Sequence, residues 1–151
     1  MMNDIGERLL PARYKIPFGD PRNAFLYRMD GNAYDGEPFG DGFGFWLAGD
    51  ASTEIVVAAG FQNAHVRLTV TSPIANTFSA NWGGARCALT LTPDNPQICD
   101  LYTSDAVWAH DSYFYSLKMR TSAGFVPARV HPPSADTRNL GVRVVPIFSE
   151  R

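Results

Sequence analysis

The chain has 151 residues, of which 45% are hydrophobic and 19% are charged, and its formal net charge is −2 at pH 7. This length predicts one domain with a hydrophobic core of its own, which needs neither a metal nor a disulfide for its stability. Because the arginines and lysines are spread along the chain and the net charge is slightly negative, the composition argues against nucleic acid as a partner.

The hydropathy of the chain bears on its compartment. No apolar run reaches the ~18 residues of a membrane-spanning helix, so we expect no membrane span. The first residues lack the basic-then-apolar order of a signal peptide. We therefore expect a cytoplasmic protein if the chain is complete as given, and an extracytoplasmic one if it is a domain of a larger envelope protein.

Residues 1–24 are predicted to form an extended N-terminal arm. Pro11, Pro17 and Pro21 interrupt any regular element there, and the apolar residues between them follow no clear period. Residues 25–151 are predicted to form a single domain.

Residues 30–42 hold four carboxylates and four glycines. Calcium takes hard oxygen ligands from closely spaced acidic and amide side chains, so one interpretation is a calcium site at Asp30, Asn32, Asp35 and Asp41. The spacing does not fit an EF-hand loop, since Tyr34 occupies a ligand position. The other interpretation is a series of ordinary turns, which such residues also favour.

The rest of the chain alternates polar and apolar residues in short runs, which is typical of β-strands. The runs lie at residues 25–29, 43–47, 53–59, 65–72, 77–82, 85–92, 97–102, 112–121 and 142–148. Eight or nine short strands without a helical period predict an all-β, antiparallel two-sheet sandwich of the jelly-roll type.

The glycine pair at residues 83–84 suits a two-residue hairpin turn and is the strongest hairpin signal in the chain. A second hairpin turning at residues 93–96 would place Cys99 opposite Thr90 rather than opposite Cys87. That register predicts two buried free thiols instead of a disulfide.

Residues 103–112 form a predicted loop that contains a large aromatic side chain. Sugars present flat C–H faces to aromatic rings and hydroxyls to polar groups, so this loop is a candidate glycan-binding patch. Its residues are Trp108, Asp105, His110 and Asp111. The alternative is that Trp108 folds back and covers the end of the sandwich.

The other two tryptophans have different predicted roles. Trp82, beside the glycine turn, is a second and weaker candidate for ligand binding. Trp46 lies between apolar neighbours and is predicted to belong to the core.

Residues 124–144 are too rich in proline and polar residues to continue a strand, and they predict an ordered crossover before the last strand. Asp136 is expected to pair with Arg138, and Leu140 to enter the core. Gly124 is expected to supply a backbone angle that other residues resist, and Gly141 opens the last strand.

The same segment resembles the closing part of small β-sandwich domains found beside, or fused to, bacterial membrane glycosyltransferases and other surface-polysaccharide proteins. In that group a Gly-Phe-Val-Pro run, here residues 124–127, precedes an acidic residue, an arginine and a Leu-Gly-Val, here residues 140–142. Residues 45–57 are similar to the upstream half of those domains, so the likeness covers roughly residues 30–148. The resemblance implies a jelly-roll-like accessory or glycan-associated domain, and it transfers no catalytic residue.

Motifs for catalysis are missing from the sequence. His65, His110 and His131 are far apart, and the chain has no His-x-His, His-Glu-x-x-His, Gly-x-Ser-x-Gly or glycine-rich phosphate loop. We therefore expect a non-catalytic accessory or carbohydrate-recognition module of bacterial envelope glycan biology. One alternative is an assembly domain that binds a protein partner or a second copy through the arm or a sheet edge; another is a small glycan-active enzyme with a carboxylate pair.

Overall fold

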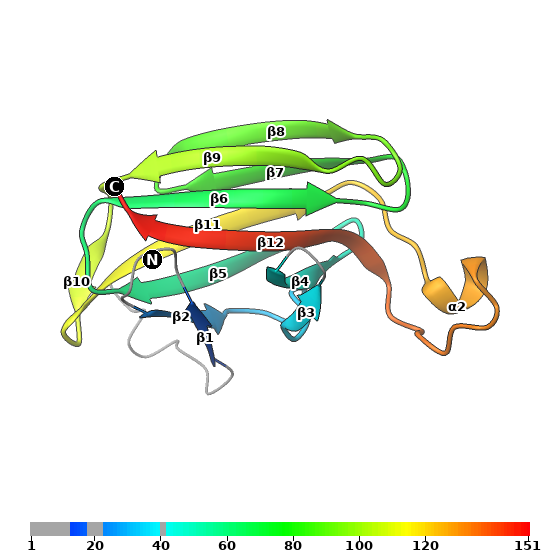
Figure 1. The fold of residues 1–151 in the computed structure, drawn as a ribbon, viewed down its shortest axis with the longest axis horizontal. Helices are drawn as coiled ribbons and strands as arrows, with labels where there is room; N and C mark the ends of the chain where they lie inside the picture. The colour runs from blue at the N-terminus through cyan, green and yellow to red at the C-terminus, as the bar shows by residue number, and fades with distance from the viewer. Residues whose placement is uncertain (1–12, 18–22, 40–41) are drawn as a thin grey trace.

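The computed structural model describes residues 13–17, 23–39 and 42–151 (Figure 1). Two antiparallel sheets pack face to face, which confirms the predicted all-β, jelly-roll-like sandwich. Sheet A has the strand order β1-β2-β5-β11-β7-β8, and β10 pairs with one end of β11. Sheet B has the order β3-β4-β12-β6-β9.

The strands of sheet A are β1 (Arg13–Pro17), β2 (Asn23–Arg28), β5 (Ser52–Ala59), β7 (Asn76–Trp82), β8 (Ala85–Leu91), β10 (Val107–Ala109) and β11 (Ser112–Thr121). Those of sheet B are β3 (Glu37–Phe39), β4 (Gly42–Ala48), β6 (Ala64–Thr71), β9 (Gln97–Thr103) and β12 (Leu140–Glu150). A single helical turn, α2 (Pro127–Val130), lies in the crossover that leads to β12. Within the described ranges, no helix is long and apolar enough to cross a membrane.

More strands are present than the eight or nine predicted, because the short β3 and β10 carry no alternation of their own. The structure describes part of the predicted arm. β1 lies inside residues 1–24 and pairs antiparallel with β2, with Tyr14 opposite Leu26. The remainder of the arm, residues 1–12 and 18–22, lies outside the described residues.

Strand β6 shows why the sequence folds into layers. Val66, Leu68 and Val70 are fully buried between the sheets, while the residues that alternate with them face outward, as predicted. Burying each such side chain contributes roughly 1.5–3 kcal/mol, so the alternation fixes which face of the strand points inward.

Three large aromatic side chains occupy the centre of the core. Trp82 of β7 stacks on Tyr115 of β11 with ring centroids 5.1 Å apart, and Phe148 of β12 lies 5.7 Å from Trp82. Their polar atoms are satisfied: the Tyr115 hydroxyl donates to the Phe61 carbonyl, and the Trp82 Nε1 donates to the Ala64 carbonyl at 3.4 Å. Burial raises the pKa of Tyr115, so this hydroxyl stays a donor.

The two cysteines form a disulfide, so the prediction of free thiols is wrong. That prediction assumed that β8 and β9 form one hairpin. Instead β8 pairs with β7 in sheet A, and β9 pairs with β6 in sheet B, so residues 92–96 cross between the sheets. Side chains of facing strands meet in the core, and the Cys87 and Cys99 Cα atoms are 6.2 Å apart, within the usual range for a disulfide.

Removing this disulfide should destabilise the fold. The two cysteines are separated by 12 residues. A disulfide that closes a loop of this size lowers the conformational entropy of the unfolded chain, which stabilises the folded state by about 3 kcal/mol. We expect dithiothreitol to lower the free energy of unfolding in urea by about that amount, and Cys87→Ala/Cys99→Ala to show the lower value without responding to dithiothreitol. Reaction of two thiols in the unfolded, unreduced protein would contradict the cross-link.

Candidate functional site

A groove of about 800 Å³ lies on the outer face of sheet A, over β5, β11, β7 and β8. One row of side chains crosses these four strands in register. In the strand register, Glu54 lies opposite Lys118, Lys118 lies opposite Asn81, and Asn81 lies opposite Arg86. Because residues directly opposite each other in a sheet point to the same face, the row presents its polar groups to the groove.

The neighbouring row explains why the surface is hollow. Ser52, Arg120, Ser79 and Ala88 are likewise in register across the four strands. Three of these side chains are small, so they leave space between the longer side chains on either side. A second hollow of about 270 Å³ shares Ser79, Ala88 and Arg120 and continues the groove along the strands toward residues 77, 90 and 122.

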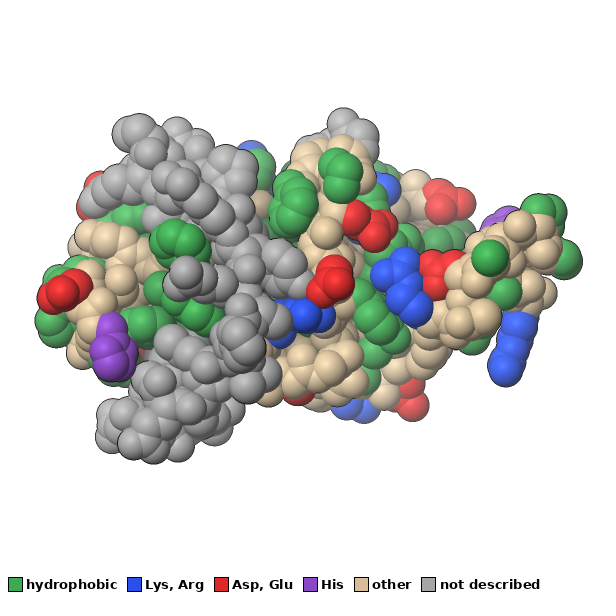
Figure 2. All heavy atoms as spheres, turned by 90° about the horizontal axis from the view of Figure 1, so that it is seen from below, with side chains coloured by type: hydrophobic (Ala, Val, Ile, Leu, Met, Phe, Trp, Pro, Cys, Tyr) green, Lys and Arg blue, Asp and Glu red, His purple; other side chains and the backbone are tan. Residues whose placement is uncertain are grey.

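The charges in the groove are unevenly compensated. Lys118 and Arg86 form no ion pair with any residue that the structure describes. Glu54 faces Lys118 across the strand pair, but its carboxylate accepts a hydrogen bond from the Ser116 hydroxyl at 2.7 Å. On the face shown in Figure 2, by contrast, acidic and basic side chains lie next to one another and largely offset each other.

The other half of the outer face of sheet A is covered by apolar side chains that pack against one another. Val56, Ala58 and Phe114 form a small second cluster with Tyr27 and nearby apolar residues. The outer face of sheet A is therefore divided into a covered apolar part and an open polar groove.

The predicted patch around Trp108 lies elsewhere. Trp108 is 58% exposed and packs against Tyr113, with ring centroids 4.7 Å apart, and Tyr113 in turn packs against the core. His110 and Asp111 are exposed and form the hairpin turn between β10 and β11, where both have positive φ. Asp105 is exposed in the preceding connection, between β9 and β10.

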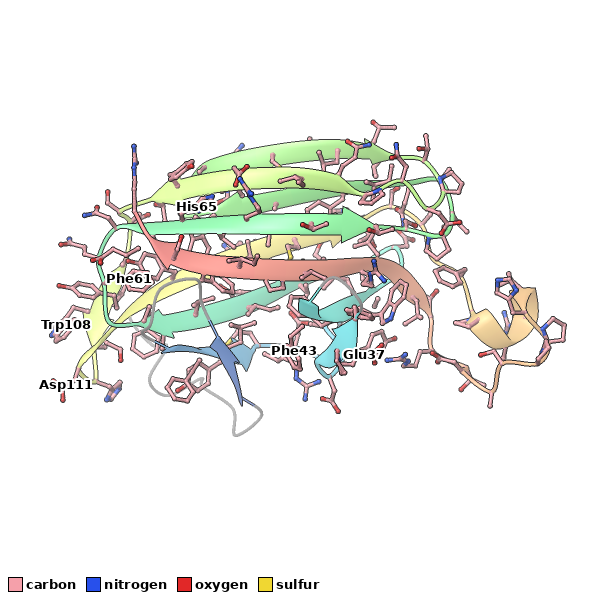
Figure 3. The ribbon with its side chains drawn as sticks, in the orientation of Figure 1. Glu37, Phe43, Phe61, His65, Trp108 and Asp111 are labelled. Carbon is pink, nitrogen blue, oxygen red and sulfur yellow. A yellow bond between two sulfur atoms is a disulfide. The ribbon has the colours of Figure 1, made fainter. Side chains whose placement is uncertain are left out.

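This hairpin and the groove are on different parts of the molecule. Figure 3 shows Trp108 and Asp111 at one end of the sandwich. Trp108 pairs with Tyr113, whereas the groove residues of β11 are Lys118 and Arg120, which belong to the opposite face of the strand. The two candidate sites cannot contact the same small ligand.

The other tryptophans correct two predictions. Trp82 is fully buried in the core, so it is not a ligand-binding residue. Trp46, predicted to be core, is half-buried on the outer side of β4 between Phe39 and Phe125, with ring centroids 6.3 and 6.0 Å away.

The acidic segment after β2 is used for structure. Asp30 accepts hydrogen bonds from the Thr53 hydroxyl at 2.6 Å, the Glu54 backbone N–H at 3.0 Å and the Asn32 backbone N–H at 2.8 Å. The Asn32 amide donates to the Ser52 carbonyl, and Asp35 pairs with Arg28 at 2.9 Å. Asp41 lies outside the described residues. No cluster of three acidic, histidine or cysteine side chains able to hold a metal occurs among the residues described.

The crossover projects from the sheets at the other end of the sandwich (Figure 1). Arg138 donates to both carboxylate oxygens of Asp136, at 3.0 and 2.7 Å, which is the predicted pair. Leu140 is buried and exchanges backbone hydrogen bonds with Phe125. These contacts hold the ends of the crossover together.

The two glycines of the crossover are needed because a larger residue would collide with neighbouring atoms. Gly124 does not have a positive φ, so the predicted reason is wrong. A Cβ at this position would collide with the Gly49 backbone and the Asn139 side chain. At Gly141 a Cβ would press on the Thr121 hydroxyl and the Ala48 carbonyl.

A Ser-His-Asp chain of hydrogen bonds lies on the outer face of sheet B, where Figure 3 labels His65. His65 Nδ1 is 3.3 Å from the Ser149 hydroxyl, and Nε2 is 2.7 Å from Asp100. Hydrogen bonds from Arg67, and then from His65, hold the pKa of Asp100 below its ordinary value. Tyr102 stacks on the imidazole ring at 4.4 Å. The cluster thus ties β12, β6 and β9 together across an open sheet surface.

The sequence does not predict the groove, because the residues that line it come from strands that are far apart in the chain. The alternation in residues 112–121 already places Lys118 and Arg120 on one face. Their neighbours on β7, β8 and β5 become neighbours only through the strand order, which no local pattern reveals.

The chain matches no model of a known protein family, and no curated protein is significantly similar to it.

The Asp136–Arg138 pair gives a pH-dependent prediction. Hydrogen bonds from Arg138 hold the pKa of the Asp136 carboxyl below its ordinary value. The pair therefore stabilises the fold above the ordinary aspartate pKa of about 3.9, and this contribution disappears as the pH falls through the lowered value.

We expect Arg138→Gln to raise the pKa of Asp136 toward the ordinary value, as followed by NMR titration of its carboxyl carbon. Because both side chains are partly exposed, the cost in stability should stay below about 1 kcal/mol. Arg129→Gln, an exposed change on α2, is the matched control. An Asp136 titration that Arg138→Gln leaves unmoved would contradict the assignment.

Proposed function

We propose that this chain is a non-catalytic carbohydrate-recognition module whose ligand occupies the groove on the outer face of sheet A. The observation that carries the proposal is the groove itself, an open hollow of about 800 Å³ floored by four hydrogen-bonded strands. Side chains on a sheet are held more rigidly than side chains on loops, which lowers the entropy cost of binding.

The chemistry of the groove suits a polyhydroxylated ligand. The side-chain oxygen of Asn81 accepts a hydrogen bond from the Gly84 backbone N–H at 2.9 Å. The side-chain amide of Asn81 also carries two N–H groups that can donate to a ligand hydroxyl. Ser79, Lys118 and Arg86 add further donors along the same floor. The second hollow extends the groove along the strands, which favours a chain-like ligand such as an oligosaccharide over a compact one.

Two further features support an envelope glycan. The resemblance of residues 122–142 and 45–57 to domains that accompany bacterial glycosyltransferases favours a role in surface-polysaccharide biology. The Cys87–Cys99 disulfide favours an oxidising, extracytoplasmic compartment, where such bonds persist.

A binding role is favoured over catalysis because the carboxylates of the groove are occupied. Asp30 holds the backbone of β5 and the turn after β2 through its hydrogen bonds. Glu54 accepts from Ser116. A glycosidase needs one carboxyl group that donates a proton and a second that acts as base or nucleophile.

A second function, assembly through protein contacts, is supported by a different surface. Ile98 and Tyr102 are 55% and 48% exposed on β9, which is an edge strand of sheet B. An edge strand with exposed apolar side chains can pair with another chain. Light scattering after size exclusion tests this function, and a monomer at all concentrations, together with failure to recover a partner, would contradict it.

A glycan array followed by titration calorimetry tests the recognition function. We expect Ser79→Tyr, which fills the floor of the groove, to weaken binding roughly tenfold or more by displacing the ligand. Tyrosine is well accepted in strands, so the variant should fold. Thr69→Tyr on the outer face of sheet B is the matched control.

The variant Trp108→Ala distinguishes the two candidate sites. If the groove is the site, this change leaves the dissociation constant unmoved, because Trp108 lies on the hairpin. Binding that Trp108→Ala removes and Ser79→Tyr preserves would overturn the groove as the site. An array on which no glycan binds would overturn the function.

A further inference from the structure

Two cations that face the groove form no ion pair with the residues that the structure describes. Lys118 and Arg86 stand on either side of Asn81 in the row that crosses β11, β7 and β8. Neighbouring strands are about 4.8 Å apart, so the backbones that carry the two cations are separated by about 10 Å. No carboxylate within the described part of the chain forms an ion pair with either side chain.

The acidic residues of the groove lie on the side away from Arg86, and Glu54 is directly opposite Lys118. Asp30 follows β2, and Glu54 belongs to β5, whereas Arg86 belongs to β8 at the other margin of sheet A. The Asp30 carboxylate already accepts three hydrogen bonds, and the Glu54 carboxylate is turned toward Ser116. The groove is therefore lined by three cations, Arg86, Lys118 and Arg120, and by two carboxylates that already accept hydrogen bonds, and its positive side lies toward β7 and β8.

Arg120 adds a third cation where the two hollows meet. It lies two residues from Lys118 along β11, on the same face of the strand. Its contact with Asp50 is 3.6 Å long, and both side chains are more than half exposed. The guanidinium also donates to the Ser52 hydroxyl at 3.0 Å. Exposed contacts of this kind are worth little, so a ligand can replace them.

We infer that the groove binds acidic saccharides, whose carboxylate or sulfate groups are bound by Arg86 and Lys118, with Arg120 as a third contact. This inference rests on the proposed function and specifies its ligand. An arginine guanidinium binds a planar or tetrahedral oxyanion through paired hydrogen bonds, while a lysine ammonium acts as a point charge. In a protein of net charge −2, a local positive groove attracts anionic ligands that the rest of the surface does not.

A single-stranded nucleic acid, the other common polyanion, fits less well. Its bases are usually bound by stacking on aromatic side chains. The described residues that line the larger hollow include no aromatic side chain. An acidic saccharide needs no stacking partner when its anionic groups supply the binding energy.

Calorimetry on the full chain tests the inference with three saccharide probes: oligogalacturonate for carboxylates, chondroitin sulfate oligosaccharides for sulfates, and dextran as the neutral reference. We expect one or both acidic probes to bind roughly tenfold or more tightly than dextran in low salt. Their affinity should fall as sodium chloride is raised, because salt screens exposed charges.

The variant Arg86→Gln/Lys118→Gln removes two exposed cations that form no ion pair within the described ranges, so folding should be retained. We expect it to lower the affinity for the acidic probe roughly tenfold or more, and to lower the affinity for dextran much less, because glutamine keeps a hydrogen-bond donor but not the charge. The matched control, Arg129→Gln/Arg151→Gln, removes the same charge elsewhere and should leave affinity within about twofold.

The outcomes separate this inference from the proposed function. Equal binding of dextran and the acidic probes would overturn the acidic ligand and leave carbohydrate recognition standing. Equal losses in the two double variants would also overturn it, because the effect would then be one of net charge. Single-stranded DNA that binds as tightly as the acidic saccharides would overturn the saccharide class. Failure of all three saccharides to bind would count against recognition itself.

Discussion

The structure depends on burying three aromatic side chains from both sheets without leaving a polar atom unpaired. Trp82 and Tyr115 of sheet A stack on each other, and Phe148 of sheet B packs against Trp82. An unsatisfied indole N–H or phenol O–H would cost about 1–3 kcal/mol in the core, so the partners of Trp82 and Tyr115 matter as much as the ring packing. Both partners, the Ala64 and Phe61 carbonyls, lie in the connection between β5 and β6 or at its end. The aromatic core thereby also holds the place where the chain passes from one sheet to the other.

The groove follows from the same strands that build this core. Strand β11 places Tyr115 and Leu117 inward and Lys118 and Arg120 outward, and β7 does the same with Trp82 and Asn81. The inner side chains fix the strands, so the outer ones are presented at a constant spacing. At the margin of the groove, β8 is an edge strand, and the disulfide from Cys87 ties it to β9 of the other sheet. Arg86 is adjacent to that anchor in the sequence.

The exposed aromatic hairpin and the groove differ in the way each could bind a ligand. Trp108 offers a flat apolar surface on the short strand β10, at the end of sheet A where β11 also pairs with β5. The groove offers hydrogen-bond donors, among them Arg86, Lys118 and Arg120, on a floor of paired strands. Specificity for a polar ligand comes from donors in fixed positions, and the groove has more such donors than the hairpin around Trp108.

The fold class, most strand positions, the glycine hairpin at residues 83–84 and the Asp136–Arg138 pair can be predicted from the amino acids alone, because each depends on residues close together in the chain. The polar face of β11 can be predicted in the same way. The three-dimensional arrangement was needed to show that β8 and β9 belong to different sheets, which joins Cys87 to Cys99, and that Trp82 lies in the core. The strand order brings Lys118, Asn81 and Arg86 together from three strands. The alternation of polar and apolar residues shows which side of a strand is polar, but it does not show which strand lies beside it. The groove depends on the order of neighbouring strands, so the alternation cannot predict it.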